Sequence, residues 1–163
     1  MWDCWLFYLP ATLVSFSLYL LWLIFGQASV LPLDLNEKWG GRELVGGGRG
    51  LLSIGFVCII GAGCAVFQQR GDDALVLALG AHFGTILNSF LKRRFQIERG
   101  KHAFPWDHID FILGASFVYW LQNPLGFEMV FRGLLVCGTL HWTVGSLIRL
   151  FLDPLRRERC LES

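Results

Sequence analysis

Long uncharged apolar blocks alternate with short polar segments along this chain. Every residue between Asp3 and Asp34 is uncharged, and similar blocks cover residues 74–91 and 133–148. About 20 apolar residues span the hydrocarbon of a bilayer, and roughly 17 are the lower limit. Blocks of this length therefore predict helices that cross a membrane.

The blocks together predict an all-α, polytopic membrane protein with five spans, near residues 5–25, 51–67, 74–91, 111–121 and 133–152. Composition agrees, because a mean hydropathy of +0.50 and a charged fraction of 17% leave too little polar surface for a soluble domain of this size. We expect one integral membrane domain over residues 1–163. The first span lacks a basic segment before it and a small-residue cleavage site, so we expect it to be retained rather than removed as a secretory signal.

Charge placement predicts how the chain is oriented in the membrane. The net charge of +1 indicates no class of partner by itself, and we expect no nucleic-acid partner. Lys and Arg gather in residues 26–50, in residues 92–110 and in the C-terminal tail, which share one side in a five-span topology. The five predicted spans make this a multi-pass protein of the cell membrane. Cytoplasmic loops are enriched in Lys and Arg, so the placement of these residues predicts its orientation. Its N-terminus lies outside, and both long loops and its C-terminus lie in the cytoplasm.

A polar stripe follows one face of the third predicted helix. Its members stand at helical spacing, with Asn88 beside them: His82, Thr85, Ser89 and Lys92. Polar groups in a span normally face the interior of the bundle, because lipid cannot satisfy them. The stripe either makes hydrogen bonds between helices or lines a cavity. His141 in the last span is expected to be a buried, hydrogen-bonded histidine.

Residues 89–110, here called the basic strip, carry five of the fourteen Lys and Arg residues. The cluster of Lys92, Arg93 and Arg94 is typical of an anchor at an anionic lipid surface. The same cations are also suited to binding phosphate groups, because Arg can bind two oxygens at once. Arg99 would extend such a phosphate site.

Two aspartates close the basic strip. Asp107 and Asp110 stand three residues apart where the next apolar block begins. Carboxylates are favoured at a helix N-terminus, so helix capping is one interpretation. Two carboxylates on one face are also a common way to bind Mg²⁺ through water and substrate phosphates. The residues alone leave both interpretations open.

The first cytoplasmic loop contains a glycine-rich run, Gly46-Gly-Gly-Arg-Gly50. Backbone N–H groups in such a run can approach a phosphate. The run lacks the spacing and the Lys-Ser or Lys-Thr pair of a P-loop, so a flexible turn is the alternative.

The basic strip resembles the CDP-archaeol synthase family, distant relatives of the CDP-diacylglycerol synthases. The segments that carry the resemblance are Ser89-Phe-Leu-Lys-Arg-Arg, Arg99-Gly and Asp107-His-Ile-Asp110-Phe. Pro32-Leu-Asp34 and Gly41-Arg42 resemble first-loop motifs of that family, and His141 falls where the family has a histidine in its last helix. The resemblance implies a small five-span enzyme that joins CTP to an archaeal ether-lipid phosphate, giving CDP-lipid and pyrophosphate.

The chain departs from the family pattern at two acidic positions. The family typically has Gly-Asp-Gly-Lys-Thr where residues 46–50 stand, so Gly47 replaces an aspartate. It usually has Gly-Asp before the Ser-Phe-x-Lys-Arg-Arg block, where this chain has Gly84-Thr85. Weakened metal binding, an altered substrate and loss of catalysis are the alternatives that these departures leave.

The resemblance implies a cytidylyltransferase that transfers CMP from CTP to a lipid phosphate. We expect it to be surrounded by membrane lipids and to have its active face in the cytoplasm. Lys92, Arg93, Asp107 and Asp110 would be catalytic, and the two aspartates would hold Mg²⁺. The residues expected to contact phosphates or nucleotide are Arg42, Gly46, Arg49, Thr85, Ser89 and Arg99. The alternatives are a non-catalytic family member that binds anionic lipid, and a small structural membrane protein.

Overall fold

The structure is a computed structural model that describes residues 2–25, 38–39, 42–43, 51–97 and 103–161. Its helices are α1 (Trp2–Phe7), α2 (Leu9–Phe25), α3 (Leu51–Gln68), α4 (Asp72–Arg94), the 3-10 helix η1 (Trp106–His108), α5 (Asp110–Trp120) and α6 (Phe127–Leu161). Strands β1 (Lys38–Trp39) and β2 (Arg42–Glu43) form a short antiparallel hairpin. The prediction of an all-α protein is therefore confirmed, apart from this hairpin.

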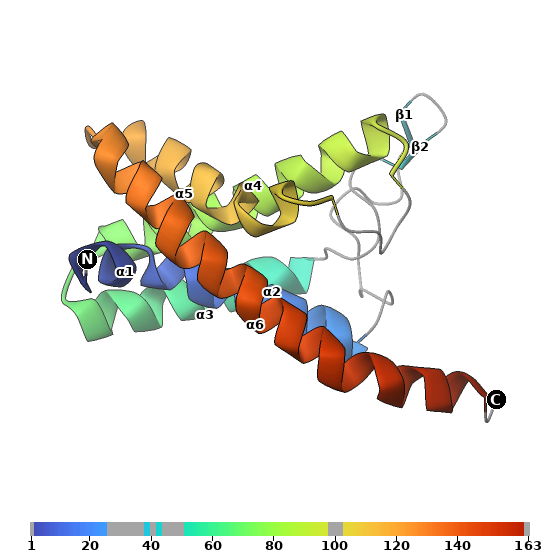
Figure 1. The fold of residues 1–163 in the computed structure, drawn as a ribbon. Coiled ribbons are helices and arrows are strands. Elements are labelled where there is room, and N and C mark those ends of the chain that lie inside the picture. The colour runs from blue at the N-terminus through green and yellow to red at the C-terminus, as the bar shows by residue number, and fades with distance from the viewer. Residues whose placement is uncertain (1, 26–37, 40–41, 44–50, 98–102, 162–163) are drawn as a thin grey trace.

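Helix α4 lies at the centre of the bundle and contacts α2, α3 and α5 (Figure 1). Its fully buried residues Leu77, Ala78 and Ala81 belong to the hydrophobic core. Residues from α2 and α5, such as Val14 and Phe111, complete that core. A central helix with small side chains allows its neighbours to pack closely, which is typical of helices in membranes.

Glycines bring α4 and α5 into backbone contact. A Cβ on Gly80 would lie 2.8 Å from the Cα of Ala115, and a Cβ on Gly84 would overlap the carbonyl oxygen of Asp110. Gly114 on α5 faces both glycines of α4. Because only glycine fits at these positions, this contact determines where the first residue of α5 lies against α4.

The first predicted span is interrupted, which corrects the expectation of one helix over residues 5–25. Helix α1 ends at Phe7 and α2 begins at Leu9. Pro10 has no N–H, so it cannot donate to the carbonyl of Leu6 four residues earlier. The side-chain amide of Gln68, at the end of α3, donates to that carbonyl instead, at 2.7 Å. The polar group that the proline leaves without its helical partner is thus satisfied from a neighbouring helix.

Other element boundaries agree with the predicted spans or extend them. Helix α3 matches the span near 51–67, whereas α4 continues through Arg94 and α6 covers residues 127–161 rather than 133–152. Lys92 to Arg94 therefore belong to the last turn of a helix and not to a loop over 92–110. Lys and Arg are good helix formers and are favoured near a helix C-terminus, which explains the extension.

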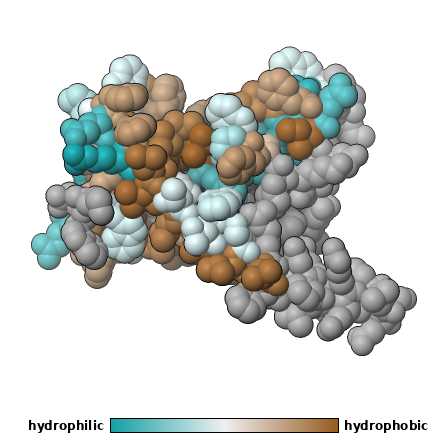
Figure 2. All heavy atoms as spheres, viewed as in Figure 1, coloured by the Kyte–Doolittle hydropathy of each residue, from teal (hydrophilic) through white to brown (hydrophobic). Residues whose placement is uncertain are grey.

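One helix of the described residues, Asp72–Arg94, is long and apolar enough to cross a membrane, while Leu9–Leu21 and Ser53–Gln68 form shorter apolar helices. Apolar side chains cover much of the visible helical surface, and hydrophilic residues gather toward its two ends (Figure 2). The end of α4, the start of α5 and the hairpin lie at the same end of the bundle (Figure 1). The five-span count itself stays a prediction.

Candidate active site

An enclosed ion pair joins the two ends of the basic strip. The ammonium nitrogen of Lys92 lies 2.5 Å from Oδ1 and 2.6 Å from Oδ2 of Asp107. Each of the two side chains is only 13% exposed. Lys92 comes from the last turn of α4 and Asp107 from η1, so the pair holds the 3-10 helix against α4.

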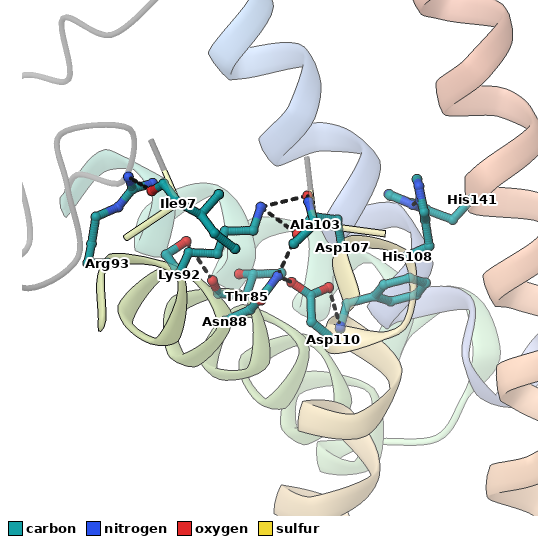
Figure 3. A network of polar contacts seen from close by, with 12 residues as sticks. Thr85, Asn88, Lys92, Arg93, Ile97, Ala103, Asp107, His108, Asp110 and His141 are labelled. Atoms are coloured by element: carbon teal, nitrogen blue, oxygen red, sulfur yellow. Dashed lines mark hydrogen bonds and ion pairs between the residues drawn. The ribbon is translucent and has the colours of Figure 1, made fainter. Parts of the chain in front are cut away.

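Asn88 connects the two aspartates that the sequence singled out. Its amide nitrogen donates to Oδ1 of Asp107 and to Oδ2 of Asp110, both at 2.8 Å. Figure 3 shows Asn88, Lys92 and both carboxylates directed toward one another. Sequence reasoning placed Asn88 beside the polar stripe and gave it no role. The available signal was an amide inside an apolar helix, one turn before Lys92.

The backbone around the aspartates fixes their carboxylates. Oδ2 of Asp107 accepts a hydrogen bond from the N–H of Ala103 at 3.0 Å, and the N–H of Asp107 donates to the Ala103 carbonyl at 3.1 Å. Asp110 begins α5, and its Oδ1 accepts the N–H of Phe111 at 2.7 Å. Asp110 therefore contacts the first turn of α5 and the cluster around Asn88 at the same time. The N-cap of α5 is Ile109, without a side-chain cap hydrogen bond, so the interpretation of Asp110 as a helix cap is wrong.

The polar stripe of α4 makes contacts of the helix-packing kind. Nε2 of His82 lies 3.2 Å from the hydroxyl of Ser53 on α3. The hydroxyl of Thr85 donates to the His82 carbonyl at 2.8 Å, and that of Ser89 donates to the Thr85 carbonyl at 2.9 Å. Lys92, the last residue of the stripe, contacts Asp107. This favours hydrogen bonding within and between helices for the buried part of the stripe.

The other two cations of the triplet take different directions from Lys92. Arg93 donates to the carbonyl of Ile97 at 2.6 Å and is turned away from the aspartates (Figure 3). Arg94 donates to the carbonyl of Trp39 at 2.7 Å and lies over the rings of Trp39 and Phe90, at 5.3 and 5.1 Å from their centres. Arg94 thus fastens the hairpin to the end of α4, by a cation–π contact as well as a hydrogen bond.

Some predicted site residues lie outside the described part of the chain. These are Gly46, Arg49 and Arg99. Arg42 lies in β2, where its backbone pairs with Trp39. Since Trp39 contacts Arg94, the strand that carries Arg42 is held near the end of α4.

A pair of histidines supports the site from the side of α6. His108, which stands between the two aspartates, is buried, and its Nδ1 lies 3.2 Å from Nδ1 of His141. Nε2 of His141 lies 3.0 Å from the hydroxyl of Ser15 on α2. The expectation of a hydrogen-bonded His141 is confirmed, although its side chain is only half-buried. The pairing with His108 was not foreseen.

The donor set at Asn88 fits a small divalent cation. Proteins usually hold Mg²⁺ with one or two carboxylates, while water and substrate phosphates supply the other oxygens. Asp107 and Asp110 meet that requirement, and the ammonium group of Lys92 shows that Asp107 binds a positive charge here. Among the described residues there is no cluster of three or more His, Cys, Asp or Glu that could hold a metal without such help.

Known proteins resemble this chain along most of its length. The sequence model of the CarS-like family, CDP-archaeol synthase, matches residues 63–152. The CDP-archaeol synthase of Methanopyrus kandleri is 35% identical over 158 residues, covering 88% of this chain and 87% of that protein. The CDP-archaeol synthase of Pyrobaculum islandicum is 35% identical over 117 residues, covering 68% of this chain and 71% of that protein.

A solved structure has the same fold. It is described as an intramembrane enzyme for archaeal membrane lipids biosynthesis, and it aligns with a TM-score of 0.73 and 25% identity. The alignment covers 89% of this chain and 94% of that one.

Proposed function

This chain belongs to the CDP-archaeol synthase family, and we propose that it is a membrane cytidylyltransferase that transfers CMP from CTP to a lipid phosphate. The observation that carries the proposal is the meeting of Lys92, Asp107 and Asp110 around Asn88 at one end of the bundle. Cationic and carboxylate groups in one place are what the binding of a metal-nucleotide requires. A lipid substrate explains why such a site is built on apolar helices.

The reaction exchanges one phosphorus–oxygen bond for another. A phosphate oxygen of the lipid attacks the α-phosphorus of CTP, and the bond from that phosphorus to the β-phosphate oxygen breaks. The products are CDP-lipid and pyrophosphate. Phosphoryl-type transfers depend mainly on positioning and on neutralising charge, so the protein needs no covalent intermediate.

The residues of the site divide these tasks. Asp107 and Asp110 would hold Mg²⁺, which when bound supplies positive charge to the triphosphate oxygens. Lys92 has three N–H donors and can contact a carboxylate and a phosphate oxygen together. Arg93 and Arg99 add positive charge for the phosphates leaving as pyrophosphate.

The remaining contacts come from the first loop and from the stripe on α4. Thr85 and Ser89 would turn their hydroxyl groups from the backbone carbonyls that they bind in this structure toward the phosphates. Arg42, Gly46 and Arg49 would close over the nucleotide. The attachment of the hairpin to Arg94 supports this role for Arg42, because it holds β2 near the end of α4.

The same proposal includes the arrangement of the chain in the membrane. Residues 1–163 form one integral membrane domain with five spans, its N-terminus outside and its C-terminus in the cytoplasm. The shared end of α4, α5 and the hairpin supports a single active face (Figure 1). The basic residues of these segments support a cytoplasmic position for that face.

Product formation tests the proposal directly. Purified protein is incubated with labelled CTP, Mg²⁺ and either an archaeal ether-lipid phosphate or phosphatidic acid, and CDP-lipid is measured. We expect a labelled CDP-lipid and pyrophosphate in equal amounts. No product with either lipid would contradict the proposal and favour a non-catalytic protein that binds anionic lipid.

Asp107→Asn tests the assignment of the site in the same assay. The substitution removes one of the two carboxylates that would hold Mg²⁺ at the reacting phosphates. Turnover should therefore fall by about 100-fold or more. Asp72→Asn is the matched control, since Asp72 is exposed at the other end of α4 and should keep wild-type turnover. Equal turnover in both variants would remove Asp107 from the site.

A further inference from the structure

One amide serves two carboxylates from different elements. The Nδ2 group of Asn88 on α4 has two hydrogens, and it donates to Asp107 of η1 and to Asp110 of α5 at equal distances of 2.8 Å. Like charges this close repel each other, so a donor or a cation must lie between them. Asn88 and Lys92 fill that need from successive turns of α4 (Figure 3).

Asn88 contributes an uncharged polar group of α4 to the two aspartates. Thr85 and Asn88 stand three residues apart on the same face of α4. The hydroxyl of Thr85 donates to the carbonyl of His82, and the amide of Asn88 contacts both aspartates. Asn88 thus brings an amide of α4 to both carboxylates, beside the ammonium group of Lys92.

We propose that Asn88 supplies the third oxygen ligand of a divalent-cation site that Asp107 and Asp110 complete. This inference rests on the proposed function, and it adds a metal-site residue from α4 to the two aspartates. The amide carries an oxygen on its other arm, and a half-turn about its last side-chain bond exchanges the two arms. Carboxylate and amide oxygens are the ligands that Mg²⁺ and Mn²⁺ prefer.

The charge of this ligand set determines its affinity. A neutral amide in place of a third carboxylate leaves two negative charges at the cation, and affinity for hard cations rises with the number of charged ligands. We therefore expect the site to bind a free divalent cation weakly, and to bind it more tightly when nucleotide phosphates add their oxygens.

Direct cation binding tests the role of Asn88 without an activity measurement. Mn²⁺ binding to the full-length protein in detergent micelles is measured by electron paramagnetic resonance, with Mn²⁺ alone and with Mn²⁺ plus CTP. Asn88→Ala should weaken Mn²⁺ binding by about tenfold or more. Asn88→Asp should strengthen it by about tenfold, because it adds a charged oxygen at the same position.

Asn123→Asp is the matched control for the added charge. Asn123 is exposed in the turn before α6, so this variant should bind Mn²⁺ as the wild type does. If Asn88 only positions the aspartates as a donor, Asn88→Asp loses that donor and repels both carboxylates, and Mn²⁺ binding falls. Weaker binding in Asn88→Asp, or unchanged binding in both variants at position 88, would overturn the inference. Asn88→Asp decides the question if Asn88→Ala does not fold.

The inference and the proposed function fail in different ways. Suppose that the wild-type protein makes CDP-lipid and binds Mn²⁺ through Asp107, and that substitutions at position 88 do not change Mn²⁺ affinity. This result contradicts only the ligand role of Asn88 and leaves the proposed function standing. The opposite result has two parts: the wild-type protein makes no CDP-lipid, and the Asn88→Asp variant binds Mn²⁺ more tightly than the wild type. That result contradicts the proposed enzymatic function and supports the cation site.

Discussion

At the residue scale, the structure gives Lys92 and Asp107 a partner that the sequence did not indicate. The sequence marked Lys92 for phosphates and Asp107 for a metal, whereas the structure pairs the two with each other at 2.5 Å. Removing one partner of an enclosed ion pair leaves the other charge without compensation, which costs more than the pair contributes. Their pairing therefore has a consequence for stability as well as for catalysis.

Lys92→Ala should lower the free energy of unfolding by about 3 kcal/mol, because it leaves the carboxylate of Asp107 enclosed and unpaired. Arg132→Ala is the comparison, since Arg132 and Glu128 form an ion pair whose side chains are 53% and 75% exposed. An exposed pair of this kind contributes roughly 0–1 kcal/mol. Thermal unfolding in detergent micelles measures the loss of stability in both variants. Equal losses in Lys92→Ala and Arg132→Ala would show that enclosure does not strengthen the Lys92–Asp107 pair.

At the scale of elements, the site depends on how closely α4 and α5 approach. Gly84 and Gly114 allow backbone contact, and the carbonyl of Asp110 lies where a side chain on Gly84 would begin. The interruption between α1 and α2 depends likewise on a neighbour, since Gln68 of α3 binds the carbonyl that Pro10 leaves without its helical partner. Packing between helices thus decides local structure at both positions.

Gly84→Ala should push the start of α5 away from α4, because the new methyl group would overlap the carbonyl of Asp110. Overpacking of this kind costs about 1–3 kcal/mol, and moving Asp110 from Asn88 should also lower turnover. Gly63→Ala is the control, because no atom lies within 4 Å of a Cβ at Gly63 on α3. Thermal unfolding and CDP-lipid formation are measured for both variants; a Gly84→Ala protein with wild-type values would contradict the role of this contact.

At the scale of the whole molecule, Lys92, Asp107 and Asp110 are brought together where several segments of the chain meet. The hairpin, the end of α4, η1 and the start of α5 meet there, although they come from segments far apart in the chain (Figure 1). The proposed five-span topology would place this end in the cytoplasm, where CTP is available. The turns at the opposite ends of these helices would then face outward.

Cysteine labelling of the full chain tests this orientation. In a background without the five native cysteines, Gln69→Cys and Gln122→Cys lie in exposed turns at the predicted outer face. Gln96→Cys is the matched substitution at the predicted cytoplasmic face, and it is also exposed. An impermeant maleimide should label the first two in intact cells and the third only after permeabilisation. Labelling of Gln96→Cys in intact cells would reverse the predicted topology.

Much of the element order follows from the pattern of charge. The blocks at 51–67 and 74–91 matched α3 and α4 because uncharged runs long enough for a span are rarely anything but helices. Helix α4 ends three residues beyond the predicted span, because its last turn contains Lys92, Arg93 and Arg94, and such residues are favoured at a helix C-terminus. The break at Tyr8 was missed because one proline near a helix start is often tolerated.

The sequence by itself determined the helical class of this protein and its resemblance to the CDP-archaeol synthases, and it marked Lys92, Asp107 and Asp110 as candidates for the site, because these depend on composition and on local spacing. Tertiary structure alone decided that Asn88 joins the two aspartates and that His108 meets His141. Those partners are 19 to 33 residues apart. Contacts at such separations depend on how closely helices pack, and the glycines that set this distance give no sign of their partners in the sequence.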